Sequence, residues 1–202
     1  MSKKPIVHVV DDDASVRTAL TRLLKAAGHA VRAWASAEEF LHADACDALG
    51  CILLDIRMPG MNGMELQQAL AQLHPGLPII FLTGHGDLAI GVRAMKAGAV
   101  DFLTKPVERE ALLAAVANAL TRDAANRAVH DDLHLLQERH ATLTPREREV
   151  FALVATGATN KQISIEIAAA ERTVKLHRAR VMAKMQATSL ADLVRAADRL
   201  RK

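Results

Sequence analysis

Aromatic side chains are scarce in this chain of 202 residues, which has no tyrosine, one tryptophan and four phenylalanines. Proteins that bind single-stranded nucleic acid without sequence preference stack bases on exposed aromatic rings. The composition therefore argues against that class. Half of the residues are apolar, mainly alanine, leucine and valine, so the chain can bury a core in one large or two small domains.

Cysteines and long apolar runs are also rare. The two cysteines, Cys46 and Cys51, form no CxxC pair, so we expect reduced thiols of a cytoplasmic protein. No apolar run approaches the roughly 20 residues that a membrane helix needs. The first run ends at three aspartates, residues 11–13, which is not the pattern of a signal peptide. We therefore expect a soluble protein of the cytoplasm without a membrane partner.

Charge is divided unequally along the chain. Residues 1–141 hold 14 lysines and arginines against 17 aspartates and glutamates, whereas residues 142–202 hold 12 against 6. The net charge of +3 thus combines −3 in the larger part with +6 at the C-terminal end. A basic end on a mildly acidic chain is a hint of nucleic-acid binding at that end.

Five short apolar runs alternate with segments of helical spacing in the first part of the chain. The runs cover residues 5–10, 31–35, 51–54, 78–83 and 100–103. Helices are expected between them and over residues 108–120. Strands that alternate with helices pair in parallel, with helices on both faces of the sheet. The sequence therefore predicts an α/β fold of the flavodoxin-like (βα)5 type.

Polar residues stand where four of these runs end. Asp55 comes directly after the third run, and taken alone it could be only the cap of a turn before a Pro-Gly pair. Asp11 and Asp12 follow the first run, and Thr83 ends the fourth. Lys105 is the second residue after the fifth run. Open α/β sheets bind ligands at the carboxyl edge of their strands. We therefore expect these five side chains to converge.

The rest of the chain is expected to be helical. Residues 121–141 are polar and lack proline and glycine, which fits an extended fifth helix, a partly helical linker or a dimerising segment. Four short helices are expected from residue 142, the first with Thr144 and Glu147 in a capping-box pattern. The third, residues 171–185, is basic. A helix–turn–helix whose second helix is basic is a DNA-binding arrangement.

Four motifs of the first part resemble the receiver domain of two-component response regulators. They are Val9-Val10-Asp11-Asp12, Leu54-Asp55-Ile56-Arg57-Met58-Pro59-Gly60-Met61-Asn62-Gly63, Leu82-Thr83-Gly84 and Phe102-Leu103-Thr104-Lys105-Pro106. The match covers about the first 120 residues, and four separated motifs are more specific than any single one. The resemblance implies that Asp55 accepts a phosphoryl group from a sensor histidine kinase.

The same resemblance implies a Mg²⁺ site, because three convergent carboxylates would repel one another without a cation. Asp12, Asp55 and the main-chain carbonyl of Arg57 would bind the metal directly. Asp11 would act mainly through water.

Phosphate contacts and signalling are also assigned by the resemblance. Lys105 would offset charge on the transferred phosphoryl group, and Thr83 would offer it a hydroxyl. The Lys105-Pro106 bond is a candidate cis peptide. Thr83 would then move toward the phosphate and the switch residue Phe102 would follow it inward, which reshapes the surface around Arg93 and Lys96 and favours a homodimer. Such a protein is no enzyme toward other molecules and catalyses only its own phosphoryl transfer and slow dephosphorylation.

The basic end resembles the LuxR/FixJ type of helix–turn–helix, and FixJ-type regulators most closely. The motifs that carry the resemblance are residues 143–150, 160–163, 172–187 and 189–193. They imply binding to double-stranded promoter DNA and contact with RNA polymerase. The candidates for reading base edges in the major groove are Lys175, Leu176, Arg178 and Ala179. The candidates for phosphate contacts are Lys161, Thr173, His177 and Lys184.

Three positions depart from the pattern of that family. Ala168 stands at the usual turn glycine, and Ala170 stands at the usual serine or threonine cap of the recognition helix. A missing cap costs about 1 kcal/mol. Ala179 replaces a base-contacting lysine of some relatives. A phosphorelay or protein-interaction module that no longer binds DNA is therefore an alternative, and a metal-dependent phosphohydrolase with similar carboxylates is a third.

The motifs predict the domain boundaries as a receiver domain over residues 1–121, a helical linker over 122–141 and a helix–turn–helix domain over 142–202. Two aspartates are expected to cap helices, Asp13 for the first and Asp87 for the fourth. His85 is expected to gate hydrolysis or to be exposed.

Overall fold

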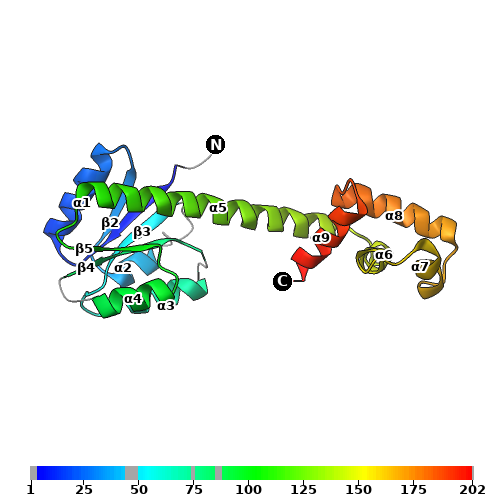
Figure 1. Ribbon diagram of the computed structural model, residues 1–202, viewed down its shortest axis with the longest axis horizontal. Coiled ribbons are helices and arrows are strands. Elements are labelled where there is room, and N and C mark those ends of the chain that lie inside the picture. The colour runs from blue at the N-terminus through cyan, green and yellow to red at the C-terminus, as the bar shows by residue number, and fades with distance from the viewer. Residues whose placement is uncertain (1–3, 44–49, 74–75, 85–87, 202) are drawn as a thin grey trace. The chain divides into compact units, whose positions relative to one another are not determined.

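The computed structural model describes residues 4–43, 50–73, 76–84 and 88–201. Cys46, His85 and Asp87 lie outside the described residues. The chain divides into two compact units, Met1–Arg127 and Ala128–Lys202, which are described separately (Figure 1).

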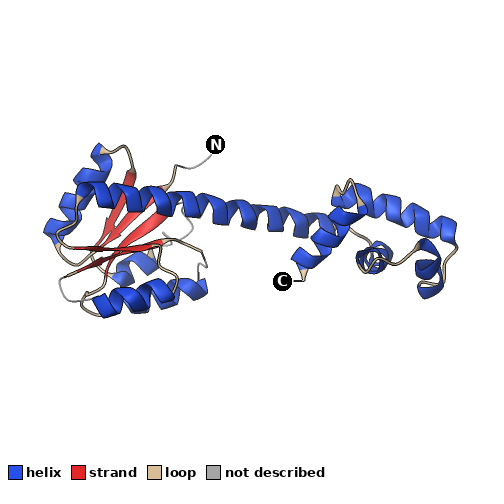
Figure 2. Cartoon of the chain, in the orientation of Figure 1, coloured by secondary structure: helices blue, strands red, loops and turns tan. Residues whose placement is uncertain are grey.

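The first unit is built on a five-stranded parallel sheet (Figure 2). Its strands are β1 (Ile6–Val10), β2 (Ala30–Trp34), β3 (Gly50–Asp55), β4 (Ile79–Thr83) and β5 (Asp101–Thr104). They lie in the order β2-β1-β3-β4-β5, so the chain reverses its direction across the sheet between β1 and β3. Ligand sites of open α/β sheets lie at such a point. The predicted flavodoxin-like fold is confirmed.

Helices cover both faces of this sheet. They are α1 (Ala14–Ala26), α2 (Ala37–His42), α3 (Gly63–Leu73), α4 (Leu88–Lys96) and α5 (Arg109–Ala141). One core cluster joins α1 and α5 to the sheet, with Leu24 and Leu112 fully buried. The other joins α2, α3 and α4 to the opposite face, with Phe40 and Leu66 fully buried. Strands that are covered on both faces read as continuous apolar runs, which is why the sequence reveals them so clearly.

Each predicted strand end lies within one residue of the observed one, but the third strand differs in a way that matters. Asp55 was expected just after that strand, and it is the last residue of β3. It pairs with Leu82 of β4, and the next amide, of Ile56, still donates to the Leu82 carbonyl at 3.1 Å. The carboxylate is therefore carried by a backbone that the sheet holds in place.

The fifth helix is longer than residues 108–120. α5 runs without a break from Arg109 to Ala141, which matches the extended-helix alternative for residues 121–141. Its contacts with the first unit continue beyond residue 121. The buried Asp123 accepts a hydrogen bond from the amide of Gly50 at 2.9 Å, and Asn126 donates to the Gly76 carbonyl at 3.0 Å.

The second unit contains four further helices. They are α6 (Pro145–Ala155), α7 (Asn160–Glu166), α8 (Glu171–Met185) and α9 (Leu190–Leu200). Val150, Ile163 and Val174 are among the fully buried residues of their shared core. Thr144 and Glu147 form the expected capping box of α6. None of the helices in the described part of the chain is long and apolar enough to cross a membrane.

Candidate functional site

Three carboxylates meet at the carboxyl edge of the sheet. Asp11 and Asp12 follow β1, and Asp55 ends β3 beside them. One oxygen from each lies within 4.8 Å of the others. Asp11 is fully buried and Asp55 is 7% exposed, whereas Asp12 is exposed at the rim. Two negative charges are thus held in a poorly solvated place, next to a third that faces solvent.

Lys105 reaches this group from the loop after β5. Its ammonium lies 2.7 Å from Oδ2 of Asp11 and 3.0 Å from Oδ2 of Asp55. Burial raises the pKa of Asp55, and the hydrogen bond from Lys105 opposes that rise. Burial alone would lower the pKa of Lys105, but its hydrogen bonds to Asp11 and Asp55 leave that pKa above the ordinary value. The Lys105-Pro106 peptide is cis, as expected.

The composition of the pocket fits a hard divalent cation. All three side chains offer carboxylate oxygens, the ligands that Mg²⁺ prefers. One lysine opposes three carboxylates, which leaves uncompensated negative charge, and part of it is buried. The amide of Arg57 points back toward Asp55, with 3.4 Å from its nitrogen to Oδ1. The loop that offers the Arg57 carbonyl therefore lies beside the three carboxylates.

Thr83 and Phe102 lie on the neighbouring strands. Thr83 ends β4 at the same edge of the sheet, is almost fully buried, and donates its hydroxyl to the Gly84 carbonyl at 3.1 Å. Phe102 of β5 is half-buried and packs against the same core cluster as Ile90 of α4. A Cβ at Gly91 would lie 3.3 Å from the Phe102 ring, so this glycine makes room for the ring against α4.

Two residues that support the pocket, Arg17 and Gly63, were given no role there from the sequence, whereas Asp13 was expected as a cap. Arg17 of α1 donates to the main-chain oxygen of Asp11 at 2.7 Å. A Cβ at Gly63 would collide with the main-chain oxygen of Asp55, so no larger residue fits there without a shift of the backbone. Asp13 caps α1 by accepting from the amides of Ser15 and Val16, as expected. The Asn62-Gly63 pair at the start of a helix was the feature of the sequence that could have identified Gly63, whereas no local pattern marks Arg17.

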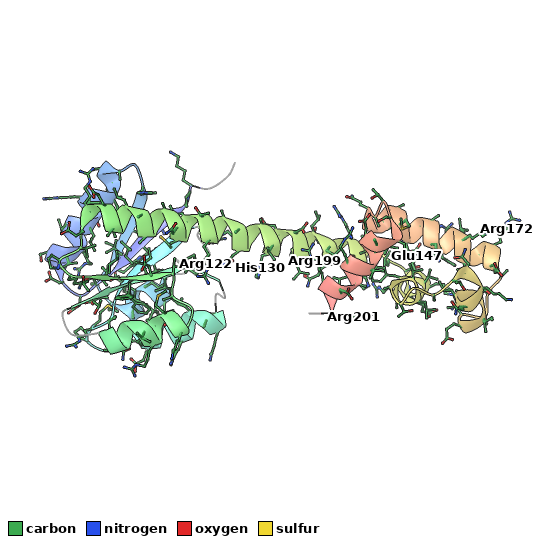
Figure 3. All side chains as sticks on the ribbon, in the orientation of Figure 1. Arg122, His130, Glu147, Arg172, Arg199 and Arg201 are labelled. Carbon is green, nitrogen blue, oxygen red and sulfur yellow. The ribbon has the colours of Figure 1, made fainter. Side chains whose placement is uncertain are left out.

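The second candidate site is the outer surface of α8 and the start of α7. Five of the eight proposed DNA-contacting residues are exposed, namely Lys161, Thr173, Lys175, Leu176 and Ala179. Arg172 also extends from the start of α8 (Figure 3). His177 is half-buried, and its Nδ1 is buried without a hydrogen-bond partner among the described residues.

Two of the proposed DNA contacts already have partners within the domain. Arg178 donates to Oδ1 of Asn160 at 2.8 Å, which joins α8 to α7. Lys184 lies 2.6 Å from Oε2 of Glu147. Glu147 is a buried carboxylate of α6 (Figure 3). A phosphate contact by Lys184 stays a prediction, and a role inside the fold is visible beside it.

The turn before α8 bears out both departures noted in the sequence. Ala168 has φ +48, in the left-handed region that glycine prefers. Ala170 is the N-cap of α8 and supplies no side-chain hydrogen bond. The turn therefore holds one residue in a conformation that glycine prefers, and α8 begins without a side-chain cap.

Comparison with known proteins matches both units. Residues 7–117 fit the family of the response regulator receiver domain, and residues 141–197 fit that of bacterial regulatory proteins of the luxR family. The chain is 48% identical to Nodulation protein W of Bradyrhizobium diazoefficiens, over 98% of this chain and 88% of that protein. It is 42% identical to the transcriptional regulatory protein FixJ of the same species, over 98% and 97%.

A solved structure agrees. The response regulator StyR is 45% identical, with a TM-score of 0.84, over 97% of this chain and 99% of that one. The chain therefore belongs to the two-component response regulators that act on transcription, with a receiver domain followed by a LuxR-type DNA-binding domain, as in FixJ.

Proposed function

We propose that a sensor histidine kinase phosphorylates Asp55, and that the phosphorylated protein dimerises and binds promoter DNA in the cytoplasm. The observation that carries this is the position of Asp55, nearly buried at the sheet edge, within reach of Lys105 and of two further carboxylates. A structural turn cap would need none of these neighbours.

The transfer is a substitution at phosphorus. A carboxylate oxygen of Asp55 attacks the phosphorus of a phosphohistidine, the P–N bond breaks, and the imidazole leaves with a proton from solvent. Asp55 then holds an acyl phosphate. Lys105 exchanges its contact with the Asp55 carboxylate for one with a phosphoryl oxygen, and Thr83 donates its hydroxyl to another. The chain acts only on itself in this reaction and in the slow hydrolysis that later releases inorganic phosphate and restores the Asp55 carboxylate.

The residues that would hold Mg²⁺ are Asp12 and Asp55, with the Arg57 carbonyl, while Asp11 would contribute through water. Bound there, the metal offsets the negative charge that accumulates on the phosphoryl oxygens.

Asp55→Asn tests the acceptor directly. After treatment with a small-molecule phosphodonor and Mg²⁺, intact-mass spectrometry should find one added phosphoryl group on the wild-type chain and none on the variant. Equal phosphorylation of both proteins would contradict the assignment of Asp55.

We further infer that the signal leaves the pocket through Thr83 and Phe102 to α4. That helix exposes Val92 and Met95, at 47% and 40%, beside Arg93 and Lys96. An apolar strip with charged neighbours suits a reversible homodimer contact. If charge-neutral replacement of Arg93 and Lys96 left phosphate-driven dimerisation unchanged, this choice of surface would be wrong.

We assign DNA recognition to α8. Its exposed Lys175, Leu176 and Ala179 would read base edges together with Arg178. Phosphates would be contacted by Lys161, Thr173, His177 and Lys184. The dimer on the promoter would then contact RNA polymerase.

A second candidate function rests on the strained Ala168 and the uncapped Ala170, which would suit an interaction module without DNA binding. A gel-shift titration separates the two. Binding that resists competitor DNA and falls steeply with salt supports the regulator, because released counterions dominate such affinities. Absence of a specific shift at low salt supports the interaction module.

A further inference from the structure

The loop between β3 and α3, residues 56–62, carries the Arg57 carbonyl and is held by local hydrogen bonds at its two ends. The Gly63 amide donates to the Ile56 carbonyl at 3.1 Å. The Asn62 side chain accepts from the amides of Met64 and Glu65, both at 3.0 Å. These contacts join the two ends of the loop and fix the start of α3, but they do not include Gly60 or Met61.

A residue from another element holds the loop at Gly60 and Met61. Oε1 of Glu38, on α2, accepts a hydrogen bond from the Met61 amide at 2.8 Å. The preceding residue, Gly60, has φ +74, and a Cβ there would lie 2.7 Å from the same oxygen. The loop therefore passes directly against the Glu38 carboxylate, and only glycine fits at position 60 without a shift.

Glu38 is itself carried on an anchored helix. Ser36 caps α2 by accepting from the Glu39 amide at 3.1 Å. Ala37 and Phe40, on either side of Glu38, are fully buried against the sheet. The backbone that carries Glu38 is therefore fixed, so that its half-buried carboxylate holds the loop from a constant position.

We propose that Glu38 is a positioning residue for the phosphorylation pocket, which holds the loop at Met61 so that the Arg57 carbonyl is presented to the metal. Glu38 is not one of the three clustered carboxylates and does not touch the reacting atoms. The inference rests on the proposed magnesium-dependent phosphorylation. Loss of a group that orients a metal ligand typically weakens metal binding by about ten- to a hundredfold.

Three variants of the full-length protein distinguish the effect of the Glu38 hydrogen bond from the effect of its charge and from a general effect of changing α2. Glu38→Ala removes both the acceptor and the charge. Glu38→Gln keeps an oxygen acceptor and removes the charge. Glu39→Ala is the matched control, because Glu39 accepts from the Ala35 amide at 2.7 Å and holds no part of the loop. Mg²⁺ affinity is measured by calorimetry, and the rate of phosphorylation is measured with a small-molecule phosphodonor.

Glu38→Ala should weaken Mg²⁺ binding about tenfold and slow phosphorylation at limiting Mg²⁺, with recovery at saturating Mg²⁺. Glu38→Gln and Glu39→Ala should stay within about twofold of wild type. If the alanine variant does not fold, Glu38→Asp, which is too short to reach Met61, should show the same loss.

Wild-type affinity in Glu38→Ala would overturn the proposal, and so would an equal loss in Glu38→Gln or in Glu39→Ala. A wild-type chain that neither binds Mg²⁺ nor accepts phosphate would instead overturn the proposed function.

Discussion

Lys105 supplies positive charge between Asp11 and Asp55, at 2.7 and 3.0 Å from their carboxylates. In the proposed transfer reaction the same charge would face the phosphoryl oxygens. Lys105→Met should therefore lower the rate of phosphorylation by a small phosphodonor by about a hundredfold, the typical effect of removing one preorganised donor. Lys25→Met, which changes an exposed lysine of α1, is the control and should leave the rate unchanged. A wild-type rate in Lys105→Met would remove this lysine from the mechanism.

His8 is a buried histidine on β1 that the proposed function does not use. Its Nδ1 accepts from Trp34 at 3.2 Å, and its Nε2 is buried without a partner among the described residues. Burial, with a smaller effect of Arg32, lowers the pKa of His8 to about 4. Below pH 6.5 the unfolded chain therefore binds a proton that the folded chain does not, and stability falls as the pH falls toward 4.

Denaturant titrations of the wild type and of His8→Leu at pH 7 and pH 5 test this effect. The wild type should lose about 2 kcal/mol more unfolding free energy over that interval than the variant. Parallel losses in both proteins would mean that another group controls the response to pH.

At the scale of elements, the turn from α7 to α8 has two unfavourable features, and one substitution should remove each of them. Ala168→Gly removes the cost of φ +48, and Ala170→Ser supplies the missing cap of α8. Each should raise the unfolding free energy by about 1 kcal/mol. Ala152→Gly, in the middle of α6, is the opposite control and should lower it by about 1 kcal/mol. If neither Ala168→Gly nor Ala170→Ser raised the unfolding free energy, the two features would not destabilise the domain.

The contact between α6 and α8 includes an ion pair between the buried Glu147 and the half-buried Lys184. A hydrogen bond from the Lys184 side chain, together with one from the Thr144 main-chain amide, lowers the pKa of Glu147 to about 2. The stability that this pair contributes is therefore present above about pH 4.5 and is lost as the pH falls toward 2.

Lys184→Met removes the cation beside the Glu147 carboxylate and should cost about 1 kcal/mol of unfolding free energy, because Lys184 is 35% exposed and solvent screens the pair. Lys161→Met, at an exposed lysine, should cost almost nothing. A fully stable Lys184→Met protein would shift the role of Lys184 toward the phosphate contact expected from the sequence.

At the scale of the whole molecule, the sequence was sufficient to predict the elements that have a regular apolar pattern or a local capping pattern. Strands such as β3 are continuous apolar runs, and caps such as Asp13 and Thr144 lie within a few residues of the amides they accept from. The supporting contacts were not predictable in this way. Glu38 meets Met61, and Asp123 meets Gly50, across many residues, and neither pair leaves a periodic or local pattern. Such contacts depend on how the elements pack, so they emerge only with the fold.

The central claim is that phosphate on Asp55 controls DNA binding by the second unit. Promoter-DNA affinity and dimerisation should be measured at one fixed salt concentration, with and without a small-molecule phosphodonor and Mg²⁺, for the wild type and for Asp55→Asn. We expect the donor to raise the affinity and the dimer fraction of the wild type and to change neither in Asp55→Asn. An equal response of the two proteins, or no response of either while the wild type is phosphorylated, would contradict the claim.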